Sequence, residues 1–248
     1  MELSVRMQNN VSLVPEHSCV GDIGCDHGYA SIYLCREKHC RVIAMDVNRG
    51  PLAIAEKNIA QAGLAEQIEC RRSDGMAELI PGEVDTLLIA GMGGMLTTRI
   101  LESHPEVLQE IDMLVLQPQS DFYAVRKSVF SRGFAITRET ICRDGGKYYI
   151  AIQAVRSRGA GNQSGINQKT RTYTEAEYAF GRFLPEKNDR LYREYLLAEK
   201  AKTEHIQREL EEKEGASSHI QSRIQELSHT LELINQTLSG FKKYGGQK

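Results

Sequence analysis

CVGDIGCDHG, residues 19–28, is the part of the chain that points most clearly to a fold. Its first half is a short β-rich run, and acidic and glycine residues alternate from the end of that run onward: Asp22, Gly24, Asp26 and Gly28. In an open α/β sheet, ligands bind outside the carboxyl ends of the strands, and glycine lets the backbone approach a ligand closely. The stretch therefore predicts a ligand-binding loop after the first strand of an α/β domain.

The two carboxylates in this loop indicate what kind of ligand it binds. A dinucleotide site would need the pattern G-x-G-x-x-G and a pyrophosphate at a helix N-terminus, and Asp22 and Asp26 would repel that pyrophosphate. They suit a cofactor that carries a cationic sulfonium and an ammonium group. A simple turn held by the two aspartates, with no ligand, would also account for the pattern.

Strand candidates alternate with helical segments over residues 1–156. The predicted strands are 19–23, 41–45, 67–71, 84–89, 113–117, 134–142 and 148–154, and the helical segments include 51–62, 95–102 and 121–131. Strict alternation predicts right-handed crossovers and a parallel sheet covered on both faces. The short RDGGK link between the last two strands predicts an antiparallel hairpin. An α/β, Rossmann-like sheet finished in this way is typical of class I methyltransferases, whereas dehydrogenases usually continue with another crossover.

Acidic residues also follow the second and third predicted strands. Asp46 lies about twenty positions after the first loop, where a carboxylate can accept hydrogen bonds from both ribose hydroxyls. An N-cap for the next helix would use an aspartate there too. Asp74 is placed to accept a hydrogen bond from an adenine amine, and the neighbours Val47 and Gly75 are included in the predicted cofactor site.

The ends of the fourth and fifth predicted strands are bare or rich in amides. The segment Ala90-Gly91-Met92-Gly93-Gly94 is too small for core packing and too apolar for an ordinary surface turn. A backbone this bare suggests that a flat or bulky group fits against it. Gln117-Pro118-Gln119 puts two amides and a rigid turn at the same edge of the sheet.

Together these motifs resemble one family, the bacterial tRNA adenine-N1 methyltransferases of the TrmK type, which modify adenine 22 of tRNA. The matching pieces are a helical lead-in ending in Leu13-Val14-Pro15, then DIGCDHGYASIYL, VDTLLIAGMGG and LVLQPQ, and a C-terminal pair of helices. The resemblance implies S-adenosyl-L-methionine binding at Asp22, Gly24, Asp26, His27, Asp46, Asp74 and Gly91–Gly93. Gly28 and Ala90, beside these positions, complete the expected cofactor site. The helical appendage is implied to help hold tRNA.

Adenine N1 has an exposed lone pair once the base is unpaired, so no proton must be removed before it attacks the methyl group. Alignment and exclusion of water should then supply most of the acceleration. We expect Asp26 to stabilise the positive charge that develops on the base, with Gln117 or Gln119 binding the base edge. Tyr29 is the expected stacking partner, with Met92 as a second one. His27 is either a further polar contact or a capping or packing residue.

The C-terminal third has a different pattern. Residues 157–170 are rich in Gly, Ser, Asn and Gln and predict a linker between a catalytic domain, 1–156, and a helical domain, 171–248. Ile220, Leu227 and Ile234 alternate with Ile224, Leu231 and Leu238 at spacings of four and three. This pattern predicts two long helices folded as an antiparallel coiled-coil hairpin, or else an intermolecular coiled coil. A basic stretch around the linker predicts contacts with tRNA phosphates, although a solvated linker also collects such residues: Arg156, Arg158, Lys169 and Arg171.

Composition narrows the class of protein. Hydrophobic residues make up 41% and charged residues 26% of the chain, as in globular proteins. No apolar run approaches the roughly 18 residues that cross a bilayer, and the N-terminus does not resemble a signal peptide. Six scattered cysteines without a C-x-x-C pair indicate free thiols, and no metal site is expected. We therefore expect a cytoplasmic protein that binds no membrane. We also expect a monomer, because the helical hairpin would cover its own apolar positions.

Two other functions fit parts of the pattern. A small-molecule methyltransferase would share the cofactor end and use the C-terminal helices as a cap over its pocket. A non-enzymatic adaptor would keep the fold without the reaction, although an unused site has no physical reason to keep its acidic and glycine positions. Strongly salt-dependent binding of tRNA would separate the tRNA enzyme from the small-molecule enzyme. The absence of methyl transfer to any RNA would favour the adaptor.

Overall fold

A computed structural model of the chain describes residues 3–157, 173–187, 189–212 and 218–244. The chain divides into two compact units, residues 1–164 and 165–248, and the boundary falls within the predicted linker.

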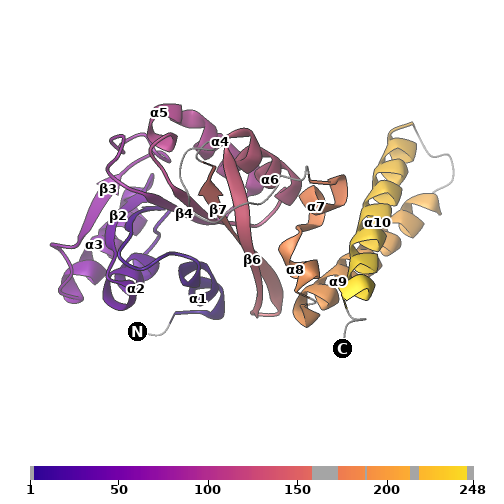
Figure 1. The fold of residues 1–248 in the computed structure, drawn as a ribbon, viewed down its shortest axis with the longest axis horizontal. Helices are drawn as coiled ribbons and strands as arrows, with labels where there is room; N and C mark the ends of the chain where they lie inside the picture. Colours follow the sequence, from indigo (N-terminus) through magenta and orange to yellow (C-terminus); the bar gives the residue numbers. More distant parts are fainter. Residues whose placement is uncertain (1–2, 158–172, 188, 213–217, 245–248) are drawn as a thin grey trace. The chain divides into compact units, whose positions relative to one another are not determined.

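The first unit is built on a seven-stranded sheet with the order β3-β2-β1-β4-β5-β7-β6 (Figure 1). The strands are β1 (Cys19–Ile23), β2 (Arg41–Asp46), β3 (Ile68–Arg72), β4 (Thr86–Met92), β5 (Met113–Pro118), β6 (Phe134–Asp144) and β7 (Lys147–Arg156). Strands β1 to β5 pair in parallel, and β7 is antiparallel to both of its neighbours. The predicted Rossmann-like sheet with a closing hairpin is confirmed, and β7 lies between β5 and β6.

The helices of this unit are α1 (Val5–Ser12), α2 (Tyr29–Lys38), α3 (Arg49–Gln61), α4 (Gly94–Ser103), α5 (Pro105–Leu108) and α6 (Phe122–Ser131). Helices α1, α2 and α3 share one core with the sheet, in which Leu88 and Val115 are buried. Leu87, Ile89 and Leu116 alternate with those residues and are also buried, so they line the opposite face. Helices α4 and α6 pack against each other, α4 against β4 and β5, and α6 against β6.

The prediction that strands and helices alternate strictly is wrong at one connection in the sheet. The connection between β3 and β4 contains turns and no helix. Arg71 holds this connection, because its guanidinium donates to the Glu83 carboxylate at 2.8 and 2.9 Å and to the carbonyl oxygen of Glu78 at 2.6 Å. Hydrogen bonds from one arginine side chain thus hold this connection in place of a crossover helix. The short helix α5 was not predicted.

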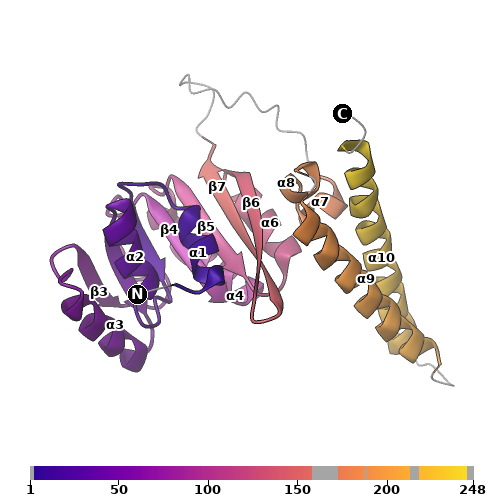
Figure 2. The same ribbon diagram turned by 90° about the horizontal axis from the view of Figure 1, so that it is seen from below.

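The second unit contains α7 (Glu175–Phe180), α8 (Phe183–Glu186), α9 (Arg190–Glu211) and α10 (Ser218–Tyr244). Figure 2 shows α9 and α10 side by side in opposite directions, as expected for a helical hairpin. Helices α7 and α8 also pack on α10, and Leu233 and Phe241 are buried in addition to the predicted Leu227 and Ile234. The other predicted contact positions are only half-buried: Ile220, Ile224, Leu231 and Leu238.

Candidate active site

The loop after β1 is tied to the neighbouring elements on both sides. Gly24 has a φ of 77°, and the N–H groups of Gly24 and Cys25 both donate to the carbonyl oxygen of Met45, at 2.8 and 2.9 Å. Gly28, with a φ of 75°, precedes α2, and a Cβ there would lie 3.1 Å from the Cβ of Ala55 in α3. Both glycines are needed for the backbone to take this path.

Asp22 lies beneath the loop as a buried acid. Its Oδ2 accepts a hydrogen bond of 2.6 Å from the Ser31 hydroxyl at the first turn of α2. Burial raises the pKa of Asp22 to about 6; the hydrogen bond from Ser31 lowers it, and the charge of Asp46 raises it further. Among the described residues no lysine, arginine or histidine forms an ion pair with Asp22, so the carboxyl group lacks a cationic partner.

The rim of the loop carries the predicted catalytic residue Asp26. Its backbone is left-handed, with a φ of 52°, and its side chain is 72% exposed. The Nδ1 of His27 lies 3.6 Å from the Asp26 carboxylate, and the His27 ring meets the half-buried Tyr29 ring edge-on with 6.0 Å between centroids. The three residues predicted from the sequence as polar and stacking contacts thus lie together.

Asp46 ends β2 beside the first loop. Its Oδ1 accepts a hydrogen bond of 2.8 Å from the N–H of Asn48. The N-cap residue of α3 is Asn48, so Asp46 is not the helix cap that the sequence left open. Val47 follows with a side chain that is 49% exposed. Asp74 is exposed after β3, and Gly75, with a φ of 61°, packs against Ile100.

The bare segment at the carboxyl end of β4, residues 90–94, lies against the first loop. Gly91 has a φ of 77° and interrupts the pairing of β4 with β5. A Cβ at Gly24 would lie 2.3 Å from the Met92 Cε, so the Met92 side chain covers Gly24 directly. Gly93 is the N-cap of α4, and a Cβ at Gly94 would lie 2.3 Å from the carbonyl oxygen of Ser120.

The two glutamines at the carboxyl end of β5, Gln117 inside the strand and Gln119 just after it, make different contacts. Gln119 fixes the bare segment, because its Nε2 donates to the carbonyl oxygen of Gly91 at 2.9 Å and its N–H to that of Met92 at 2.8 Å. Gln117 is 1% exposed and paired in register with Ala90. Its Nε2 donates to the Pro118 carbonyl oxygen at 3.3 Å, and its buried Oε1 has no partner among the described residues. A buried acceptor without a donor is costly unless a ligand supplies one.

Arg6, on α1, lies at this edge and was missed by the sequence analysis. Its Nη1 is 3.4 Å from the position of a Cβ on Gly91, and its guanidinium lies over the Tyr149 ring at 5.3 Å from the centroid. No sequence signal marked it, because a single arginine on an amphipathic helix is most often a solvated residue.

Of the predicted phosphate contacts, only Arg156 lies among the described residues. Arg156 ends β7, which runs antiparallel, so it lies at the opposite edge of the sheet from Gln117. Its guanidinium donates to the carbonyl oxygens of Ile111 and Leu108 and packs over the Phe134 ring at 4.3 Å. This arginine braces the fold rather than facing a substrate. Arg158, Lys169 and Arg171 lie outside the described residues.

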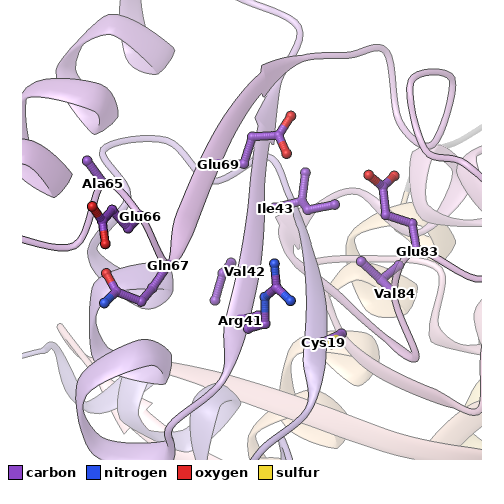
Figure 3. Close-up of a pocket in the computed structure, with 10 residues that line it drawn as sticks. All are labelled: Cys19, Arg41, Val42, Ile43, Ala65, Glu66, Gln67, Glu69, Glu83 and Val84. Atoms are coloured by element: carbon purple, nitrogen blue, oxygen red, sulfur yellow. The ribbon is translucent and has the colours of Figure 1, made fainter.

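A cavity of about 530 Å³ in the first unit lies away from this site (Figure 3). It is lined at the amino ends of the strands by residues that include Cys19, Arg41 and Glu69. Ligands of open α/β sheets bind at the opposite, carboxyl ends. We therefore assign the site to the edge that carries Asp22 and Gly91, and not to this cavity.

The cysteines at 19, 25, 35, 40, 70 and 142 are free thiols, as expected. Within the described ranges, no group of three or more metal-binding side chains gathers. None of the helices in those ranges has the length and apolarity to cross a bilayer.

The sequence of this chain is similar to that of one protein family and its members. The sequence model of the family described as tRNA (adenine(22)-N(1))-methyltransferase, TrmK, matches residues 20–236. The protein of that description from Bacillus subtilis strain 168 is 27% identical over 239 residues, which cover 96% of this chain and 98% of that protein.

Solved structures agree over the same length. The crystal structure of the B. subtilis m1A22 tRNA methyltransferase TrmK matches with a TM-score of 0.83 and 26% identity, covering 96% of this chain and 99% of that one. A crystal structure of Streptococcus pneumoniae Sp1610 in complex with S-adenosyl-L-methionine matches with a TM-score of 0.79 and 27% identity, covering 96% and 100%.

Proposed function

This chain belongs to the TrmK family of tRNA (adenine(22)-N(1))-methyltransferases, and we propose how the edge that carries Asp22 and Gly91 performs the family reaction. The enzyme uses S-adenosyl-L-methionine to methylate N1 of adenine 22 in tRNA. The observation that carries the residue assignments is the buried Asp22 carboxyl group, which lies without a cationic partner beneath a glycine loop.

The residues of the site fit this cofactor. Asp22 offers a buried carboxylate to the ammonium group, and a cation there would favour its ionised form. Asp46 accepts from the ribose hydroxyls, and the exposed Val47 side chain gives the adenine ring an apolar surface. Asp74 accepts from the adenine amine, with Gly75 keeping the backbone close. When bound, the cofactor supplies an electrophilic methyl group on a sulfonium.

The target base is held by the opposite half of the site. The free Oε1 of Gln117 accepts a hydrogen bond from the exocyclic amine of adenine, which leaves N1 directed at the methyl group. The backbone of Gly91 and Gly93 leaves room for a flat ring, and Tyr29 stacks on it. Gln119 acts indirectly, since its amide already holds Gly91.

Asp26 stabilises the product-like charge. Methylation at N1 makes the base cationic, and an exposed carboxylate at the rim lowers the energy of that charge as it develops. No base is needed to remove a proton. The side chains therefore supply alignment and electrostatic stabilisation.

The test is transfer of labelled methyl groups to unmodified bacterial tRNA, followed by digestion to nucleosides. We expect N1-methyladenosine from the wild-type enzyme, and loss of label with Asp22→Ala or Asp46→Ala. Label in another nucleoside would contradict the assigned acceptor atom. Cofactor binding without label in tRNA would indicate a small-molecule acceptor instead.

We expect the chain to be a monomer and to act in the cytoplasm. Helices α9 and α10 cover each other's apolar positions, including Leu196, Leu227 and Ile234. This supports a monomer, and a stable dimer in sedimentation at micromolar concentration would contradict it. A tRNA substrate and six free thiols support a cytoplasmic location.

A further inference from the structure

Helix α1 places Arg6 at the active-site edge by several fixed contacts. The hydroxyl of Ser4 caps the helix by accepting from the N–H of Met7 at 3.3 Å. At the other end, Gln153 in β7 donates to the carbonyl oxygen of Leu13 at 2.6 Å, and Val11 is buried in the core shared with α2 and α3. The N–H of Arg6 also donates to the Asp144 carboxylate in β6 at 3.2 Å, so hydrogen bonds to the sheet hold the helix near both ends.

The Arg6 guanidinium lies between two surfaces. Its Cζ lies over the Tyr149 ring, 5.3 Å from the centroid. Nη1 lies 3.4 Å from where a Cβ would stand on Gly91, so the guanidinium lies beside the Gly91 backbone. A cation over an aromatic ring uses none of its N–H donors for that contact, so the N–H groups of Arg6 remain available.

No carboxylate neutralises this arginine within the described residues. The carboxylate of Asp144, in β6, accepts a hydrogen bond of 3.2 Å from the backbone N–H of Arg6. It forms no ion pair with the Arg6 side chain. Arg6 is half-buried. A half-buried cation without a counter-charge is stabilised when a ligand brings a negative charge to it.

Unpartnered polar groups share the same side of the sheet. Gln117 lies two residues after Val115 in β5 and so on the same face of the sheet; Val115 belongs to the core under α1, which puts the partnerless Oε1 of Gln117 on the α1 side. Asn10, one turn after Arg6, is 4% exposed, and its Oδ1 has no partner among the described residues. Buried polar atoms of this kind indicate a surface completed by a polar ligand.

We propose that Arg6 binds an oxyanion of a substrate, held by its planar fork while Tyr149 keeps the guanidinium in orientation. Two substrates carry such a group: the phosphate next to the target adenine and the carboxylate of the cofactor. Arginine pairs with either through two parallel hydrogen bonds. Arg6 is a substrate-positioning residue at the methyl-transfer site, and this role rests on the proposed function.

The experiment compares Arg6→Met with Arg6→Lys and with Arg41→Met in the full chain. Arg41 is an exposed arginine at the amino end of β2, so its replacement controls for the loss of one positive charge away from the site. Two quantities are measured for each protein. The first is the dissociation constant of S-adenosylhomocysteine and of its decarboxylated analogue. The second is the KM for tRNA at several salt concentrations.

Contact with the cofactor carboxylate predicts that Arg6→Met weakens S-adenosylhomocysteine binding by at least tenfold and leaves the decarboxylated analogue within twofold. Contact with a phosphate predicts unchanged cofactor binding, at least a tenfold higher KM for tRNA, and a logarithmic salt slope smaller by about 1. In either case Arg6→Lys recovers only part of the loss, since it keeps the charge without the fork.

The proposal is overturned if Arg6→Met leaves both affinities and the salt slope within twofold of wild type. It is also overturned if Arg41→Met produces the same changes, or if the only effect of Arg6→Met is a lower melting temperature. Wild-type methylation of tRNA is measured in parallel. Its absence would refute the proposed function, whereas normal wild-type activity with an unaffected variant would refute only the role of Arg6.

Discussion

At the scale of single residues, the buried Asp22 makes cofactor binding depend on pH. Its pKa is raised to about 6 in the cofactor-free protein. In the proposed site the ammonium group of the cofactor binds the ionised form of Asp22, so below about pH 6 cofactor affinity should fall towards tenfold per pH unit. Calorimetric titration with S-adenosylhomocysteine between pH 5 and 8 checks this. A flat profile would show that Asp22 does not meet the ammonium group.

The same residue should make the cofactor-free protein less stable at neutral pH. The folded pKa of Asp22, about 6, lies above its ordinary value of 3.8, so between these values the folded state binds the proton more tightly than the unfolded state. The contribution of Asp22 to the free energy of unfolding is therefore most favourable at low pH. It falls as the pH rises from 3.8 to about 6 and stays level at higher pH.

Asp22→Asn removes the buried charge and keeps the shape. We expect the free energy of unfolding at pH 7.5 to rise by about 1–3 kcal/mol, with a smaller gain at pH 4.5. Cofactor affinity should fall by at least tenfold. Urea unfolding at both pH values measures the first effect. A variant that is less stable at both would mean that the Ser31 hydrogen bond outweighs the cost of burying the charge.

Gly94 and Gly93 form a matched pair for backbone packing. A Cβ on Gly94 would lie 2.3 Å from the Ser120 carbonyl oxygen, whereas one on Gly93 would lie 3.6 Å from the Ser120 hydroxyl. We expect Gly94→Ala to cost about 1–3 kcal/mol in unfolding free energy and Gly93→Ala to cost far less. Thermal unfolding compares them. Equal costs would mean that the loop at Ser120 moves aside freely.

The sequence predicted those site residues that lie at the end of a strand. Asp22 and Asp46 were predicted because carboxylates at the carboxyl ends of adjacent parallel strands must meet. Arg6 and the contact of Met92 with Gly24 were not, since both depend on how separate segments pack. The two amides were grouped together, and only packing distinguishes the buried Gln117 from the bracing Gln119.

At the scale of elements, an ion pair joins α6 to β6 inside the protein. The Arg126 guanidinium donates from Nε to the Glu139 carboxylate at 2.9 Å, and both side chains are fully buried. Removing one partner leaves an uncompensated charge, so Glu139→Leu should cost about 3–5 kcal/mol. Adding Arg126→Met should recover much of that loss. Chemical denaturation of the single and double variants tests this, and simple addition of two losses would contradict it.

Most elements were predictable because their signals are local. The strands of the parallel sheet are short apolar runs ended by Gly, Asp or Pro, and the β6–β7 hairpin follows from Gly145-Gly146. The connection from β3 to β4 was not predictable, since the hydrogen bonds between Arg71 and Glu83 are tertiary contacts. The packing of α7 and α8 on α10 was missed for the same reason.

At the scale of the whole molecule, two compact units should unfold separately. Only the unit spanning 1–164 carries the cofactor residues. Scanning calorimetry of the full chain should therefore show two transitions. S-adenosylhomocysteine at about a hundred times its dissociation constant should raise one of them by about 5–10 °C and leave the other unchanged. A single transition that shifts as a whole would show that the units unfold together.

The position of β7 has a consequence for how the enzyme is made. A ribosome releases β6 before β7, yet β6 joins the sheet only through β7, which lies between it and β5. Until residue 156 is free, the nascent chain carries an unpaired edge on β5 and a tethered strand with no place in the sheet. Synthesis that pauses just after β6 would hold the protein in its most aggregation-prone form, so rapid passage through this short stretch protects the yield of active enzyme.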